Sequence, residues 1–214
     1  MNKQNIKKAG VLLAACLLVA ALALLAIAGL RAKYVTTVDL TGAVHFTADL
    51  AVDVTLLEHK AERNSDGSYK LHTTETVATN TYVVMPGVDI PKDPTITITT
   101  KSAIPAYLYV EVVGEPPTEV SYAMKSCWQK LSISGRKVYV YQDSGSYDLT
   151  DANGDGIIEL EILENNKIIV SDKFDPASGS FNINFSAYLI QISKDSGGNN
   201  ELPETLFEQY YGTP

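Results

Sequence analysis

The chain has 214 residues, 45% of them hydrophobic, and its 17 basic and 25 acidic residues give a formal net charge of −8. This length is sufficient for one domain with a sizeable core. The negative charge argues against a nucleic-acid partner and against adhesion to anionic lipid.

The first feature along the chain is an uncharged segment, residues 9–30, which follows three lysines and precedes Arg31. Basic residues before a long apolar run are typical of a segment that directs export. Residues 1–31 are therefore predicted to be a signal peptide or an N-terminal membrane anchor. The rest of the protein is expected to be extracellular or at the cell surface.

The two fates of this leader remain open. The triplet Ala26-Ile27-Ala28 offers a signal peptidase a cleavage site before Gly29. A run of about 20 apolar residues is also long enough to span a bilayer as a helix. Residues 9–30 would then hold the protein to the membrane.

Cleavage after Ala28 leaves 186 residues, in which 14 basic residues face 25 acidic ones, a net charge of about −11. Cys127 is the one cysteine of this part, so no internal disulfide can form and the core alone must hold the fold. We interpret Cys127, which adjoins Trp128, as a small buried apolar residue.

Residues 32–192 are predicted to form a β-sandwich, because apolar and polar residues alternate in several short segments. The segments are 50–56, 95–99, 107–112, 158–162 and 181–189. Such alternation is typical of antiparallel strands with one buried and one wet face, and turn residues separate the segments. The expected fold class is therefore an all-β, antiparallel, jelly-roll-like sandwich.

A connector rich in proline, residues 86–94, interrupts these strands. Pro86, Pro91 and Pro94 remove backbone donors, so we expect a stiff strap that joins no ladder and crosses between the sheets. Lys92 and Asp93 are expected at its solvent-facing turn.

A candidate metal site lies at residues 151–156. Asp151, Asn153 and Asp155 place oxygen donors at alternate positions and Gly156 follows, which is how a Ca²⁺ loop begins. Position twelve is Ile162, where a complete loop needs a bidentate carboxylate. A partial Ca²⁺ site and an ordinary hairpin turn are the two interpretations, and the turn is favoured.

No other pattern indicates chemistry, and the chain is not expected to be an enzyme. His45, His59 and His72 form no zinc motif, and we interpret them as surface or satisfied histidines. The tyrosines could stack on sugars, but packing at a sheet surface is the simpler interpretation.

The chain is predicted to end in a polar linker and a short helix, which together cover residues 193–214. Residues 193–200 are polar and contain glycine. Pro203 suits the first turn of a helix, and Leu206, Phe207 and Tyr210 follow with helical spacing. The helix is expected to dock on the sandwich.

Two strings resemble the exported TasA and camelysin family of Gram-positive bacteria. Residues 86–94 read Pro-Gly-Val-Asp-Ile-Pro-Lys-Asp-Pro and precede the strand Ala-Tyr-Leu-Tyr-Val at 106–110. Residues 187–191 read Ala-Tyr-Leu-Ile-Gln, similar to the late family strand A-Y-A-I-Q except at Leu189. The leader is unusually long, and the family string A-Y-F-T-D is missing after it.

The resemblance implies a jelly-roll-like sandwich, export through a signal peptidase, and assembly into biofilm matrix fibres by strand donation. The donor would be residues 32–46, whose apolar side chains could fill a groove of a second copy. The leading expectation is thus a non-catalytic surface or biofilm matrix protein that self-associates through strand edges. A membrane-tethered binding module with a partial Ca²⁺ loop is the alternative. A camelysin-like metallopeptidase is a remote one, since no zinc motif is present.

Overall fold

The computed structural model divides the chain into two compact units, Met1–Tyr34 and Val35–Pro214. The structure describes residues 52–99, 105–149, 155–176 and 181–212, and the backbone of two short strands before them. The predicted leader, residues 1–31, lies outside this part. Within it, no helix is both long and apolar enough to cross a membrane.

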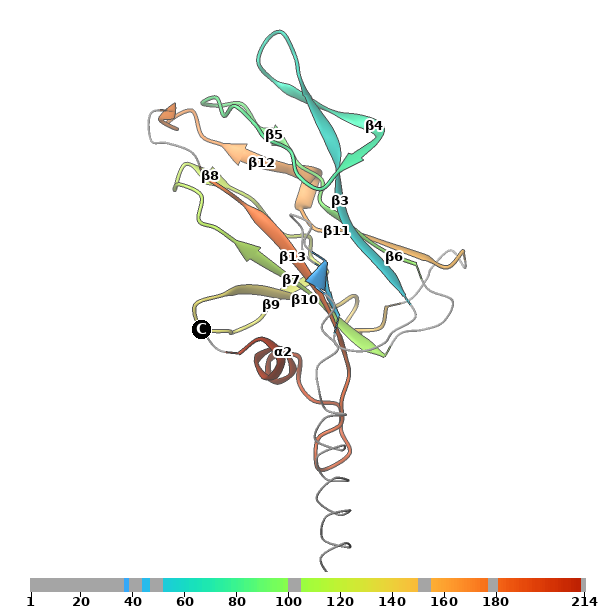
Figure 1. The fold of residues 1–214 in the computed structure, drawn as a ribbon. Coiled ribbons are helices and arrows are strands. Elements are labelled where there is room, and N and C mark those ends of the chain that lie inside the picture. The colour runs from blue at the N-terminus through green and yellow to red at the C-terminus, as the bar shows by residue number, and fades with distance from the viewer. Residues whose placement is uncertain are drawn as a thin grey trace, which may run out of the picture. The chain divides into compact units, whose positions relative to one another are not determined.

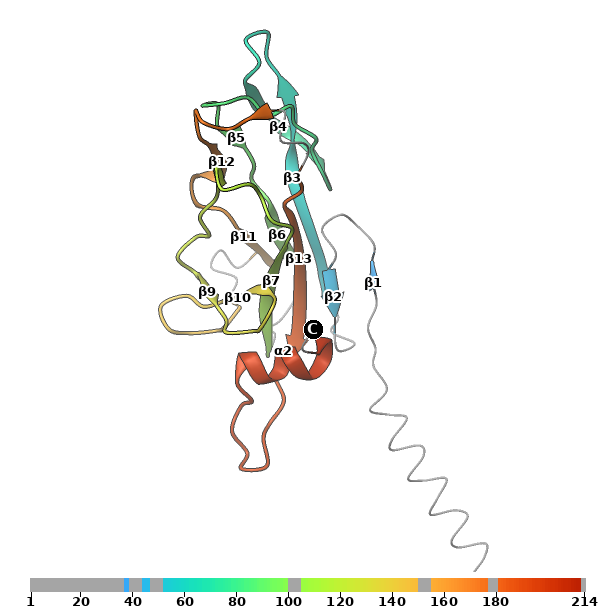
Figure 2. The same cartoon turned by 90° about the vertical axis from the view of Figure 1, so that its left-hand side faces the viewer.

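The second unit contains two main β-sheets (Figures 1 and 2). The larger has the order β1-β2-β13-β7-β10-β9 and the smaller β11-β6-β3-β4. The strands of the larger sheet are β1 (Thr37–Val38), β2 (Val44–Phe46), β7 (Ala106–Val113), β9 (Trp128–Lys130), β10 (Lys137–Tyr141) and β13 (Asn184–Gln191). Those of the smaller are β3 (Asp53–Arg63), β4 (Tyr69–Val77), β6 (Thr95–Thr99) and β11 (Ile157–Glu161).

A third, short sheet of order β5-β12-β8 lies at one end of the sandwich. Its strands are β5 (Ile90–Pro91), β8 (Val120–Ser121) and β12 (Lys167–Val170), and the 3-10 turn η1 (Glu164–Asn166) precedes β12. The helix α2 (Pro203–Tyr211) follows β13 near the end of the chain.

The main core lies between the two large sheets, where the inward residues of each alternating strand meet. Val54 and Leu56 of β3 pack with Ile96 and Ile98 of β6, and Val110 lies opposite on β7. Burial of this apolar surface is the main favourable term in folding. The predicted antiparallel β-sandwich is confirmed.

One detail of the strand prediction is wrong: the outward face of β7 is buried from Tyr107 to Glu111, and that of β13 is wet only at its start, where Asn184 is exposed. Tyr107, Tyr109 and Glu111 of β7 and Tyr188 of β13 are buried. The reason is α2, whose Leu206 joins a second apolar cluster with these tyrosines on the outer face of the larger sheet. The docked C-terminal helix is confirmed, and it buries the face of β7 that was expected to be wet, together with Tyr188 of β13.

The proline-rich connector also differs from the prediction. Ile90 and Pro91 do join a ladder, as β5 pairs with Lys167 and Ile168 of β12. Lys92 and Asp93 are buried rather than solvent-facing. Both correct the expectation of an isolated strap, and the cause is a set of charged partners on β3 that is described below.

Candidate functional site

The N-terminal strands lie at one edge of the larger sheet. β2 pairs with β13 in parallel, with Val44 opposite Ala187 and Phe46 opposite Leu189. β1 folds back on β2 in antiparallel register. The segment expected to donate a strand thus pairs in this structure with the β13 of its own chain, and the β2–β13 pairing is the parallel one in an otherwise antiparallel sheet.

The described residues of β2 pair with only part of the β13 edge. They face Ala187 to Leu189, whereas β7 on the other side pairs with all of β13, from Asn184 to Gln191. Among the described strands, none pairs with residues 184–186 on the β2 side. An unpaired edge presents backbone donors and acceptors to any extended chain that reaches it.

An apolar groove of about 240 Å³ lies beside the start of β13. It is bounded by β3, by the residues before β5, and by the start of β13. Its apolar lining consists of Leu56, Leu57, Tyr82, Val84, Ile90, Ile168, Phe181, Ile183 and Phe185. An edge strand beside a groove that accepts alternate side chains is the geometry used in β-strand addition.

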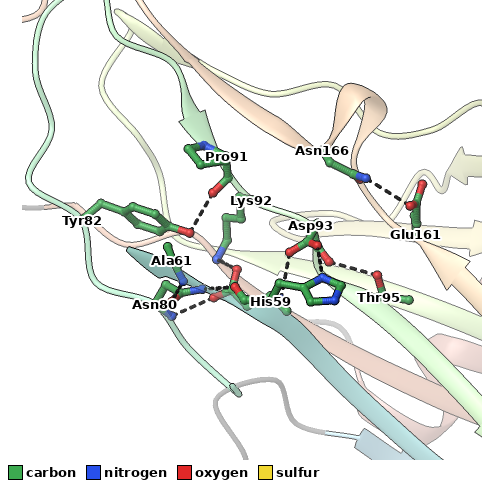
Figure 3. A network of polar contacts seen from close by, with 11 residues as sticks. His59, Ala61, Asn80, Tyr82, Pro91, Lys92, Asp93, Thr95, Glu161 and Asn166 are labelled. Atoms are coloured by element: carbon green, nitrogen blue, oxygen red, sulfur yellow. Dashed lines mark hydrogen bonds and ion pairs between the residues drawn. The ribbon is translucent and has the colours of Figure 1, made fainter. Parts of the chain in front are cut away.

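Lys92 and Asn80 of the groove, both labelled in Figure 3, bond to Glu58 of β3. Lys92 Nζ donates to Glu58 Oε2 at 2.8 Å, and the backbone N–H of Asn80 donates to Glu58 Oε1 at 2.7 Å. The Asn80 side chain accepts from Ala61 N at 2.7 Å and donates to His59 O at 2.8 Å. Asn80 thereby completes the hydrogen bonding of β3 where its register with β4 shifts between His59 and Ala61.

A second pair adjoins the first. Asp93 Oδ2 lies 2.6 Å from His59 Nδ1, and Asp93 Oδ1 accepts the backbone N–H of His59 at 3.0 Å. Tyr82 donates its hydroxyl to Pro91 O at 2.8 Å, and burial, together with the Glu58 and Asp93 charges, raises its pKa. These contacts fix the connector against β3 and so set the shape of the groove.

The histidines behave as predicted where they are described. His59 is paired with Asp93, and His72 Nε2 lies 2.7 Å from Glu62 Oε1 on the β3–β4 hairpin. The side chain of His45 lies outside the described residues. No catalytic arrangement was expected of these side chains, and their contacts are those of satisfied histidines.

The predicted Ca²⁺ loop is described only at its end, since Asp151 and Asn153 lie outside the described residues. Asp155 is exposed, and its Oδ1 accepts the backbone N–H of Ile157 at 2.9 Å, a contact typical of a turn. In the described ranges no three His, Cys, Asp or Glu side chains are grouped as metal ligands. Ca²⁺ binding at this loop stays a prediction.

Sequence reasoning missed the buried charges beside the groove, although one signal was present. Glu58 continues the inward-facing series Val54, Leu56 on β3, so its carboxylate had to be buried or the alternation had to fail. A buried carboxylate requires a partner. Lys92, in a connector without other lysines, was the candidate.

Comparison with known proteins adds no assignment. No family model matches the chain, and no curated protein matches it at a significant level. In the arrangement described above, the start of β13 lies beside an apolar groove.

Proposed function

We propose that the protein is an exported structural protein of the cell surface or biofilm matrix that self-associates by strand addition. The observation that carries this proposal is the start of β13, which none of the described strands pairs with on the β2 side and which borders an apolar groove. The leader and the family resemblance support export, and this edge supports assembly.

The donor in this proposal is the N-terminal segment of a second copy. The β1–β2 pairing demonstrates that this segment is able to form strands, and β2 already uses the β13 edge within its own chain. In a second copy, the same type of pairing would extend along residues 184–186. Backbone hydrogen bonds would then provide affinity, and apolar side chains in the groove would set the register.

The groove is suited to binding rather than to chemistry. Its buried ammonium and carboxylate, Lys92 and Glu58, neutralise each other at 2.8 Å. Leu56, Val84 and Phe185 provide apolar surface, which favours burial of side chains from an extended chain. The function is therefore proposed as non-catalytic.

The first test removes the donor. A chain beginning at Gly29 is expected to polymerise on concentration, and one beginning at Thr47 is expected to stay monomeric by light scattering. Because the shorter chain keeps the β13 edge, it should also cap growing ends and shorten polymers when mixed with the longer one. Equal polymerisation of both chains would refute donation by this segment.

The second test blocks the acceptor with two neighbouring substitutions. Val84 lines the groove, whereas the adjacent Val83 is 57% exposed. Val84→Glu should prevent polymerisation because a carboxylate in the groove would have to be desolvated. Val83→Glu adds the same charge one residue away and should polymerise normally. If both variants polymerise like the parent chain, the groove is not the acceptor.

A further inference from the structure

A second, larger cleft of about 610 Å³ lies on the outer face of the smaller sheet. Its floor is formed by outward side chains of β3, β6 and β11, which alternate with the core residues of the same strands. His59, Asp93 and Thr95, drawn in Figure 3, lie at this cleft. The volume is within the range of small-molecule and saccharide sites.

The floor is built from side chains that are neighbours across the strands. Glu161, Thr95 and Leu57 are register partners on β11, β6 and β3. Glu159 and Thr97 form the next row. Cross-strand partners on one face lie about 5 Å apart, so the hydroxyls and carboxylates form a regular array.

The wall of the cleft comes from the segment around β9 and β10, through Lys125, Cys127, Tyr141 and Asp143. The backbone N–H of Gln142 donates to Cys127 O at 2.8 Å, which ties the two sides of this wall together. Tyr141 is held by Trp128, whose ring lies edge-on at 5.7 Å. The wall is therefore fixed by packing before any ligand binds.

The charges of the cleft are unequal. Lys125 is paired with Glu161, and the His59 ring is paired with Asp93. Asp143 and Glu159 have no ion pair with any residue of the described ranges, and both are exposed. Exposed carboxylates without an ion-pair partner are hydrogen-bond acceptors. The cleft therefore favours a ligand rich in hydrogen-bond donors and disfavours an anion.

Apolar surface accompanies these acceptors. Leu57, Leu160 and Tyr141 line the same cleft. A pyranose ring has an apolar C–H face and an edge of hydroxyl groups that donate and accept, which matches this combination. Aromatic rings with a polar end suit such half-wet contacts.

We propose that this cleft binds a neutral saccharide chain, with Thr97, Glu159 and Asp143 bonding its hydroxyl groups and Tyr141 packing against a ring face. This inference does not rest on the proposed strand addition, since the four residues that it assigns line the cleft and not the groove. Binding alone is assigned, because burial raises the pKa of the Cys127 thiol and leaves it in its unreactive form.

The test is calorimetric titration of the full chain, held in a detergent without a sugar headgroup. The probes are neutral hexasaccharides of glucose and of N-acetylglucosamine, with pentalysine and an anionic hexagalacturonate for comparison. At least one neutral probe is expected to bind with a Kd below about 1 mM, and the anionic probe is not. Binding of pentalysine alone, or of no probe, would overturn the proposal.

Two variants locate the binding. Thr97→Val and Glu159→Ala should each weaken the neutral probe roughly fivefold, as expected for one lost hydrogen bond. Both positions lie on a strand face, and Thr118→Val and Glu115→Ala repeat the same changes at exposed sites outside the cleft. If the control pair weakens binding as much as the cleft pair, or if neither does, the site is not this cleft.

Discussion

Glu58 and Lys92 join the connector to β3 through an ion pair whose side chains are 3% and 11% exposed. Both charged groups have lost most of their hydration. The attraction between them in the buried environment offsets this desolvation cost. The backbone N–H of Asn80 also bonds Glu58, so the carboxylate is fully engaged.

Removing one partner of this pair should therefore be costly. Lys92→Met is expected to lower the free energy of unfolding by about 3 kcal/mol, because Glu58 is left buried and unpaired. The control is Lys167→Met, which breaks the half-exposed Lys167–Asp89 pair of 2.7 Å and should cost less than about 1 kcal/mol. Urea unfolding measures both, and equal losses would show that the burial of the first pair has no energetic weight.

The buried tyrosines are expected to make the free energy of unfolding depend on pH in the alkaline range. Burial raises the pKa of Tyr122 to about 12, and burial also raises the pKa of Tyr82, Tyr109 and Tyr188. Each of these tyrosines has a higher pKa in the folded state than in the unfolded state. Its contribution to stability is therefore complete below the pKa of the unfolded state, and it is lost as the pH rises through the pKa of the folded state. The free energy of unfolding should therefore fall between pH 10 and 12.

Ultraviolet titration of phenolate formation checks this prediction. Exposed tyrosines should ionise near the ordinary tyrosine pKa of about 10. The buried tyrosines should ionise at higher pH, together with the loss of the near-ultraviolet circular dichroism signal. Ionisation of all tyrosines in one early step, with the fold intact, would contradict the burial described here.

At the scale of elements, the turn after β7 depends on Gly114. Its φ is +103°, and a Cβ built there would lie 2.2 Å from the carbonyl oxygen of Asn182. This close approach sets where the chain enters β13, beside the candidate edge. Gly145 has a similar φ of +85° but open space around it.

The two glycines separate backbone strain from steric clash. Gly145→Ala should cost about 1 kcal/mol, the price of a left-handed conformation for a residue with a Cβ. Gly114→Ala carries the same strain and a clash with backbone, so roughly 3 kcal/mol is expected. Thermal unfolding of the two variants compares them, and similar midpoints would mean that the approach to Asn182 relaxes freely.

The C-terminal helix is held on the larger sheet by Phe207 and Arg136. Phe207 is fully buried and contacts the rings of Tyr109, Tyr188 and Tyr211. Arg136 lies over the Phe207 ring at 4.8 Å and donates two hydrogen bonds, of 2.7 and 2.6 Å, to Glu111. The helix is thus an integral part of the fold.

Phe207→Ala should remove most of this docking. A loss of about 3 to 5 kcal/mol is expected from the missing ring and the cavity that it leaves. Gln209→Ala, on the exposed side of the same helix, should change stability by less than about 0.5 kcal/mol. Chemical denaturation distinguishes the two, and a small effect of Phe207→Ala would show that α2 is weakly docked.

The element predictions succeeded where a local pattern decided the structure. Alternation located β3, β6 and β11, and Pro203 located the start of α2. The alternation pattern gave a wrong prediction for β7. It assigned Tyr107 and Tyr109 to a solvent-facing side of the strand, but α2, which is distant in sequence, covers them. The near-continuous apolar run of β7 was the available signal for burial on both faces.

For the whole molecule, the sandwich class followed from the sequence, but the pairing of its strands did not. β13 pairs with β7 and with β2, both far away in the chain, and no local pattern specifies such partners. The position of the β13 edge beside the groove results from these pairings, and the larger cleft depends on the pairing of β11 and β3 with β6. They could therefore be found only once the strands were placed in space.

If the protein assembles by strand addition, backbone amides at the start of β13 must gain hydrogen-bond partners in the assembled state. Hydrogen exchange, followed by mass spectrometry on the peptide that covers residues 181–187, measures this directly in dilute and concentrated samples. We predict that exchange in this peptide slows on assembly, and that Val84→Glu prevents the change. Assembly that leaves exchange at this edge as fast as in the monomer would contradict the account.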